Sequence, residues 1–483
     1  MTGFAPRAVT MSELHIAFVG YFLAIGVIGF AAWRSTKSVL DYAIGGRRLS
    51  APVAALSAGA SDMSGWLLLG LPGAVFAAGV GESWIVIGLA VGAWSNWHWT
   101  APRLRDDTHA LGSVTVPQFL SQRTGSGRGL RVLTSGVILG FFTLYTAGGF
   151  VAGAKLFEDV LQIDYRTALG VGVVIIMAYT AVGGFLAVSW SDVFQALLML
   201  LALVAVPAVG ATLLASSSTP VGVDWHAFSS LEAIGLISLA AWGLGYFGQP
   251  HVLARFMAMA PSTDVGAARR IGMSWMVVTG VGAIAVGLVG AAYVGPLDDP
   301  ETVFLALSRA VLNPYVAGIV IAGILAAVMS TVDSQLLVAS TALVEDVLAG
   351  LELDGPRRLW VSRAMVVGIA LIAGAIALDP ASSVLDIVAY AWAGLGASLG
   401  PSVLFCLYWR RTTATGVVSG ILAGAATVVV WRNMEGGWWD LYEIVPAFLL
   451  SAACIVACGL VRPSARAQRT FDRLRGDSVV MGP

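Results

Sequence analysis

The sequence predicts an all-α integral membrane protein with about thirteen transmembrane helices, and three observations carry this prediction. The chain of 483 residues is 58% hydrophobic and only 11% charged, with a mean hydropathy of +0.84, whereas soluble domains are about 25% charged. Gly is abundant, with 57 residues, as is usual where membrane helices pack closely. Apolar runs recur along the whole chain, and a span needs roughly 20 such residues. We therefore expect one polytopic domain, 1–483, in the plasma (inner) membrane.

The apolar runs give the expected helices in chain order. The first, at 13–33, is as long as a bilayer span, so we interpret it as a retained peripheral helix and not as a signal peptide. The other expected helices are 51–80, 83–101, 130–158, 166–184, 190–214, 230–251, 272–295, 315–346, 361–378, 384–408, 414–431 and 442–461. A short basic, polar tail at 462–483 is expected to be solvated.

Basic residues predict the orientation of these helices. With the N-terminus outside and the loops assigned alternately, the inside segments hold 22 of the 27 Lys and Arg, Arg255 among them. The long outside loop 215–229 holds none. Since Lys and Arg favour the cytoplasmic side, we expect the N-terminus outside and the C-terminus inside.

An aspartate inside an apolar segment is the first indication of function. Asp62 lies in the run 51–80, among Ser57, Gly59, Ser61, Ser64 and Gly65. A charge at membrane depth costs roughly 2.5–3.5 kcal/mol on insertion scales, so it is retained mainly in cavities and ion pathways. Small residues beside it favour an interrupted helix, whose free carbonyls can bind a cation. This combination predicts ion-coupled transport.

A second interrupted helix is expected about 180 residues later. The segment 239–256 contains Gly243, Gly245, Gly248 and Pro250. Two interrupted spans at corresponding positions of two halves indicate the midplane site of a transporter. Each opens a set of five helices, 51–214 and 230–408, and the number of spans between them gives the two sets opposite orientations. Peripheral helices at 13–33 and 414–461 complete the expected arrangement.

The expected helix 315–346 carries hydroxyl groups suited to a small cation. Ala327, Ser330 and Thr331 share one helix face, at spacings of three and four residues. Two hydroxyls and a carbonyl suit a hard cation, which prefers oxygen ligands. The two hydroxyls could instead bond carbonyls of their own helix; the interrupted Asp62 helix favours the ion interpretation.

Two further aspartates leave alternatives open. Asp333 points to a different face from Thr331, and it is either a second buried carboxylate or an interfacial one. Asp192 is expected near the inside surface, where it either lines an exit path or caps the helix 190–214 in solvent.

Most of the 16 tryptophans are expected to be interfacial anchors or core residues, but four aromatic residues near the interruptions could instead line a solute pocket. Trp66 and Trp242 flank the two breaks, and Tyr145 and Tyr246 could join them. Aromatic walls of this kind would hold a small, partly apolar zwitterion.

Other classes of function find little support in the sequence. The five histidines are scattered without HExxH or metal-ligand spacing, and no Walker or G-x-S-x-G motif occurs. We therefore expect no enzymatic activity. A net charge of −1 argues against a nucleic-acid partner, and no obligatory protein partner is evident. A membrane solute sensor remains an alternative.

Several long motifs resemble the solute:sodium symporter family. They are GGRRLSAPVAALSAGASDMSGWLLLGLPGAVF (45–76), FFTLYTAGGFVAGAKLFE (141–158), SWSDVFQALLML (189–200), WGLGYFGQPHVLARFMA (242–258) and AGILAAVMSTVDSQLLVASTALVEDV (322–347). This resemblance covers nearly the whole chain. It implies a five-plus-five inverted-repeat core of the leucine-transporter type. It also implies that the protein takes up L-proline together with sodium by alternating access. The alternatives are another small amino acid or carboxylate as solute, or a proton as coupling ion.

The resemblance also implies roles for individual residues. Sodium ligands would be the backbone carbonyls of Ala60, Met63 and Ala327 and the hydroxyls of Ser330 and Thr331. Asp62 would organise this site, with Ser61 and Ser64 beside it, and Arg47 and Asp192 would support sodium coupling on the cytoplasmic side. The solute pocket would be formed by Trp66, Gly70, Tyr145, Trp242, Tyr246 and Pro250.

Overall fold

The computed structural model describes residues 11–36, 38–216, 225–229, 231–260, 265–351, 355–379 and 382–476. Within these ranges the chain is a bundle of helices, and β pairing is limited to an isolated bridge between Leu49 and Met259. Parts of the expected outside loop (217–224) and of the tail (477–483) lie outside the described residues.

Nine helices in the described part of the chain are long and apolar enough to cross a membrane. They lie in α1 (Met11–Ser35), α8 (Arg128–Leu161), α9 (Tyr165–Ser216), α13 (Val265–Tyr293), α15 (Pro314–Ala342), α16 (Gly355–Ile376), α17 (Val384–Tyr408), α18 (Ala414–Trp431) and α19 (Ile444–Val461). Shorter elements fill the positions of the other expected spans: α3 (Ala51–Asp62) with α4 (Leu71–Ala78), α5 (Trp84–Ser95) with α6 (Ala101–Leu111), the first part of α9, and α11 (Ala233–Ala240) with α12 (Pro250–Ala258).

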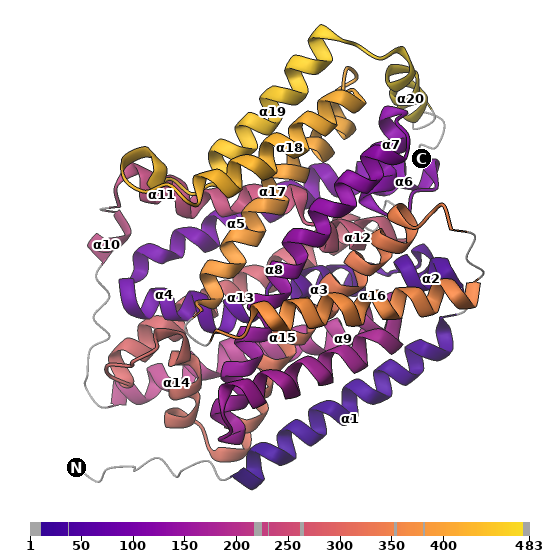
Figure 1. Cartoon of the computed structure of the whole chain (residues 1–483). Coiled ribbons are helices and arrows are strands. Elements are labelled where there is room, and N and C mark those ends of the chain that lie inside the picture. Colours follow the sequence, from indigo (N-terminus) through magenta and orange to yellow (C-terminus); the bar gives the residue numbers. More distant parts are fainter. Residues whose placement is uncertain are drawn as a thin grey trace.

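Burial separates a central group of helices from a peripheral one. About 78–83% of the apolar windows in α8, α15 and α17 are buried, compared with 22–33% in α1, α18 and α19. Figure 1 shows α1 along one edge of the bundle and the pair α18–α19 along the opposite edge. The helices expected to be peripheral therefore have little of their surface covered by protein, and the site lies among the central ones.

Several predicted boundaries were wrong, each for a local reason. The two expected helices 166–184 and 190–214 are both present in α9 and meet at a kink at Gly184 (φ 67°, ψ −177°), but the loop expected between them is missing because the second helix starts at once. The expected helix 83–101 continues through a π-helical turn at Asn96–Thr100 into α6. The tail forms a further helix, α20 (Ala465–Gly476), whose Ala467 and Leu474 are buried, so it is not simply solvated.

Candidate functional site

Both predicted helix interruptions are present. Helix α3 ends at Asp62, and Met63 has φ −82° and ψ 75°, which turns the chain out of the helix before a π-helical segment, Trp66–Gly70, leads into α4. The second interruption is a 3-10 segment, Ala241–Gly248, followed by an extended Gln249 and then α12. A Cβ on Gly245 would lie 1.9 Å from Nε1 of Trp392, so this close approach requires glycine.

Oxygen atoms from the first break and from α15 converge. Ser330 Oγ lies 2.8 Å from the carbonyl oxygen of Ala60 and 3.1 Å from that of Ala327. The hydroxyl of Thr331 lies 3.5 Å from the Ala60 carbonyl, and all of these residues are buried. Of the predicted sodium ligands, these four therefore lie together, and Met63 follows directly at the end of α3. Carbonyl and hydroxyl oxygens are the donor set that a hard cation prefers.

Asp62 connects the first break to the second. Its carboxylate oxygen Oδ2 accepts a hydrogen bond from the hydroxyl of Tyr246, while Oδ1 has no partner among the described residues. Its backbone carbonyl accepts from Trp66 Nε1 at 3.2 Å and lies 3.5 Å from the Tyr145 hydroxyl. Asp62 is 2% exposed. Asp62 thus contacts Trp66 and Tyr145 through its carbonyl and Tyr246 through its carboxylate.

The two neighbouring serines make local contacts. The Ser61 hydroxyl donates to the Ala58 carbonyl of its own helix at 3.3 Å, and Ser64 Oγ accepts from the Trp66 amide at 3.4 Å. Both serines are buried. They stabilise the chain around the break.

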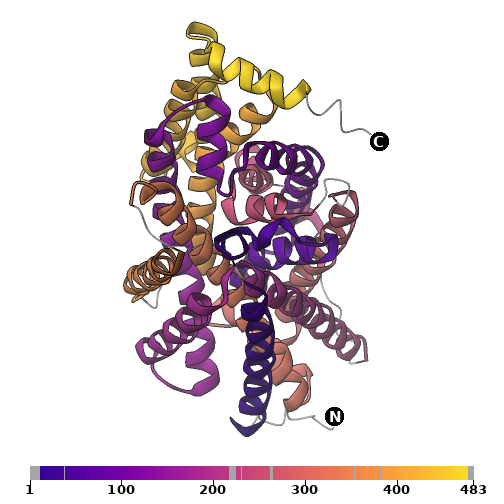
Figure 2. The same cartoon turned by 90° about the vertical axis from the view of Figure 1, so that its right-hand side faces the viewer.

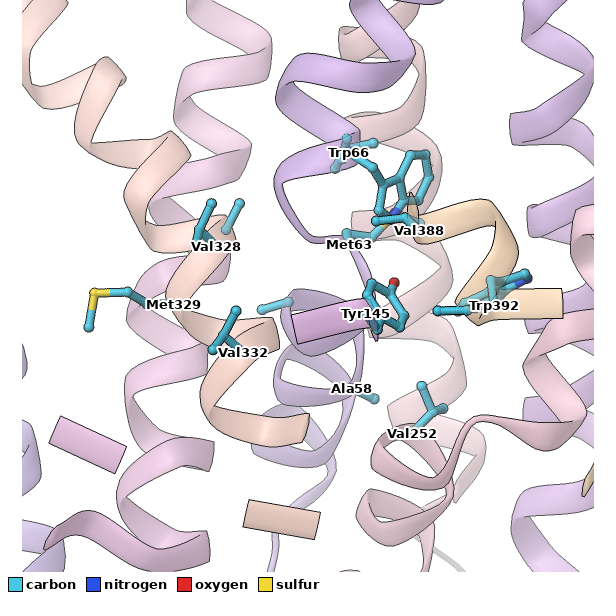
Figure 3. Packing of buried hydrophobic residues seen from close by; sticks show 14 of the residues in the cluster. Ala58, Met63, Trp66, Tyr145, Val252, Val328, Met329, Val332, Val388 and Trp392 are labelled. Carbon is cyan, nitrogen blue, oxygen red and sulfur yellow. The ribbon is translucent and has the colours of Figure 1, made fainter. Parts of the chain in front are cut away.

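The predicted aromatic residues form a cluster beside Asp62. The ring centroids of Trp66 and Trp242 are 5.9 Å apart, and Tyr246 and Tyr145 both contact Asp62. Figure 3 shows Trp66 and Tyr145 on the side of the α3–α4 break that faces Trp392. Four of the six predicted pocket residues are thus brought together. We call Trp66, Tyr145, Trp242 and Tyr246 the aromatic cage.

The contacts of the other two predicted pocket residues are with different parts of the bundle. A Cβ on Gly70 would meet Leu385 of α17 at 3.1 Å. Pro250 starts α12 and lines a small cavity with Ile138, Ala254 and Thr341.

Asp192 forms a buried ion pair, and the alternative of a solvated helix cap is therefore wrong. Its Oδ2 lies 3.0 Å from Nη2 of Arg255 and 2.6 Å from Oγ of Ser57. Arg255 also donates to Ser57 Oγ at 3.0 Å and to Ser334 Oγ at 2.5 Å. None of these side chains is exposed. Arg255 belongs to the core of α12 and not to an inside loop, because this ion pair compensates its charge.

Asp333 is also fully buried, which excludes the interfacial alternative. One carboxylate oxygen lies 3.5 Å from the Ser334 hydroxyl, and the other has no partner among the described residues. Asp333 thus lies beside the group that surrounds Arg255.

Arg47 joins three segments at one end of the bundle. Its guanidinium donates to the carbonyls of Ser113 (2.6 Å), Thr108 (3.1 Å) and Met257 (3.3 Å). Burial, with the nearby charge of Arg105, lowers the pKa of Arg47 to about 10, so it stays protonated at neutral pH. Arg47 therefore fixes the end of α12 next to the chain that enters α3.

Sequence reasoning missed two parts of the site. Arg255, Ser57 and Ser334 carry the same signal that identified Asp62, since each is polar within an apolar run. Trp392 donates from Nε1 to the Trp242 carbonyl at 2.8 Å, and its ring meets that of Tyr246 at 5.2 Å. Nothing in its local sequence distinguishes Trp392 from the other 15 tryptophans.

Comparisons with known proteins find a matching family and similar proteins. The model of the Sodium:solute symporter family matches residues 42–424. The sodium/proline symporter of Escherichia coli (strain K12) is 46% identical over 484 residues, which cover 95% of this chain and 96% of that protein. The high-affinity proline transporter PutP of Bacillus subtilis (strain 168) is 46% identical over 442 residues, covering 88% and 93%.

A solved structure shares the fold. A substrate-bound, outward-open Na+-coupled sialic acid symporter superimposes with a TM-score of 0.77 at 17% identity, covering 94% of this chain and 99% of that one. At this identity the likeness concerns the fold alone.

Proposed function

The chain belongs to the sodium:solute symporter family, and on this premise we propose that it carries L-proline into the cell together with sodium. It is a multi-pass protein of the cell membrane and, as its family is one of symporters, a transporter and not an enzyme. Relatives named for proline transport are 46% identical over nearly the whole chain, which supports L-proline as the solute.

We propose thirteen spans with the N-terminus outside and the C-terminus inside. Nine spans would be the long apolar helices, which include the second part of α9. The other four would be α3 with α4, α5 with α6, the first part of α9, and α11 with α12. Spans 51–214 and 230–408 would form the two inverted repeats, with 13–33 and 414–461 at the periphery. Figure 1 shows the start of α1 and helix α20 at opposite ends of the bundle, which supports an odd number of spans.

The proposed sodium site lies between the end of α3 and α15. Its ligands would be the carbonyls of Ala60, Met63 and Ala327 with the hydroxyls of Ser330 and Thr331. The single observation that carries this proposal is the hydrogen bond of Ser330 to Ala60, 270 residues away in the sequence. Sodium between these groups would add ligand bonds between two helices that already touch through the Ser330 and Thr331 hydroxyls.

The aromatic cage would hold the solute. Flat indole and phenol faces can pack on the methylenes of a pyrrolidine ring and leave no room for a longer side chain. Gly70 and Pro250 would bound the cage at its margins. The solute carboxylate would be met by backbone N–H groups or hydroxyls at the helix breaks, where the positive end of a half-helix lies.

Coupling would pass through Asp62. Asp62 lies two residues after Ala60, a proposed ion ligand, and its carboxylate accepts a hydrogen bond from Tyr246 in the cage. An ion that orders the end of α3 would therefore also order a wall of the cage. Coupling is then a difference in solute affinity between the ion-bound and ion-free states. Arg47 and Asp192 contact α12, and Asp192 also contacts α3. They would hold these cytoplasmic halves of the two interrupted helices together until the ion leaves.

Uptake of labelled L-proline into proteoliposomes tests this proposal. An inward sodium gradient is compared with an equal potassium gradient at the same membrane potential. Transient accumulation with sodium alone is expected. Accumulation driven equally by potassium, or by a proton gradient without sodium, would contradict sodium coupling, and accumulation of another amino acid but not proline would contradict the solute.

A further inference from the structure

The C-terminal helix α20 is held firmly against the bundle. Arg475 makes two hydrogen bonds of 2.9 Å to the carboxylate of Asp107, which is 2% exposed. Asp472 accepts two bonds from Arg410, at 2.7 and 2.8 Å. Arg123, buried beneath the helix, donates to the Ala467 carbonyl at 2.9 Å. These contacts fix which side of α20 faces outward.

The outward side carries a row of arginines. Arg466, Arg469 and Arg473 have the i, i+3, i+7 spacing of one helix face, and all three are exposed. None of them forms an ion pair with another described residue. The only acid in α20 is Asp472, which is bonded to Arg410. The positive charge of this row, which we call the arginine stripe, is therefore not neutralised by the described part of the protein.

The stripe lies near the membrane surface. Helix α19 ends at Val461. The apolar side chains of Leu460 and Val461 are 55% and 77% exposed, which is expected where the lipid-facing span ends. Only residues 462–464 separate it from α20, so the chain can travel at most about 14 Å between the two helices. Figure 2 shows α20 folded across the end of α19 and not continuing its direction. Headgroups of the adjacent leaflet are thus within reach of the long arginine side chains.

We propose that the arginine stripe binds the anionic headgroups of phospholipids in the leaflet at the end of α19. Each juxtamembrane Lys or Arg raises the affinity of a protein for an anionic membrane surface about fivefold. Three arginines therefore give on the order of a hundredfold preference for anionic over uncharged headgroups. The short link to α19 favours lipid over an acidic protein, because it keeps the stripe close to the bilayer. Arg462 and Arg411, both exposed, would extend the same surface.

Native mass spectrometry of the full-length protein released from nanodiscs tests this proposal. The nanodiscs contain equal amounts of phosphatidylglycerol and phosphatidylcholine, and the number of each lipid that stays bound is counted. The test variant is R466Q/R469Q/R473Q, and R466K/R469K/R473K keeps the charge. The charge-matched control, R34Q/R270Q/R357Q, removes three exposed arginines elsewhere.

The wild type, the lysine variant and the control are expected to retain phosphatidylglycerol in preference to phosphatidylcholine. The glutamine variant is expected to lose most of that preference while it unfolds at the same temperature. Equal phosphatidylglycerol retention by the glutamine variant and the wild type would overturn the proposal, as would loss of the preference in the lysine variant. Neither result depends on proline or sodium transport.

Discussion

Tyr246→Phe removes the hydroxyl that connects the aromatic cage, the proposed solute site, to Asp62 beside the proposed ion site. Both partners of this hydrogen bond are buried, with Tyr246 4% and Asp62 2% exposed, and Asp62 Oδ1 already has no partner among the described residues. A hydrogen bond to a charged group contributes about 1.5–3 kcal/mol, which corresponds to a factor of about 10–150 in affinity. The aromatic ring remains, so packing changes little. We expect a rise of this size in the sodium concentration for half-maximal uptake, and a weaker dependence of proline affinity on sodium.

Tyr145→Phe provides the matched control. Its hydroxyl lies 3.5 Å from the Asp62 backbone carbonyl and does not reach the carboxylate, so its loss should raise the sodium requirement by less than about fivefold. Proline uptake is measured in proteoliposomes over a matrix of sodium and proline concentrations. The reasoning is refuted if Tyr246→Phe leaves both sodium dependence and coupling at wild-type values, or if Tyr145→Phe has the larger effect.

Three further predictions follow from the same geometry. Ser330→Ala should raise the sodium requirement by about 10-fold or more, and Thr331→Ala by less, because their hydroxyls lie 2.8 and 3.5 Å from the Ala60 carbonyl; unchanged sodium titrations in both variants would exclude this ion site. Trp242→Ala should weaken proline affinity by about 10-fold with little change in the sodium requirement, since each aromatic pair contributes about 0.5–1.5 kcal/mol beyond burial, and a selective effect on sodium would contradict the cage. Arg255→Met should destabilise the protein by about 3–5 kcal/mol, because a buried carboxylate loses its counter-ion; thermal unfolding in detergent measures this, and an unchanged transition would show that the ion pair has no such role.

The sequence predicted those parts of the site that depend on local chemistry. Asp62 stands out because a charge in an apolar run is costly, and Gly243 and Gly248 mark the second break because they weaken a helix. Ser330 and Thr331 share a helix face by spacing alone. Each of these signals lies within one turn or two of a helix, so no knowledge of tertiary packing was needed.

Features that depend on packing between distant helices could not be predicted in the same way. The charge of Arg255 within an apolar run was visible in the sequence, but its neutralising partner Asp192 lies on another helix, 63 residues away. Without that partner, Arg255 was assigned to a loop, because positive charge usually marks the inside surface. Trp392 acquires its role only where α17 meets the second break. Gly184 does end a helix, as expected, but the next helix follows without the expected loop, because a single non-helical residue is enough to redirect the chain.

The most direct test concerns the claim that the ion site and the cage are coupled through Asp62. It measures equilibrium binding of labelled L-proline to the purified protein, with and without saturating sodium. The account predicts that sodium raises proline affinity in the wild type and has little effect in Asp62→Asn. A proline affinity that does not depend on sodium in the wild type, or that responds equally in Asp62→Asn, would contradict it.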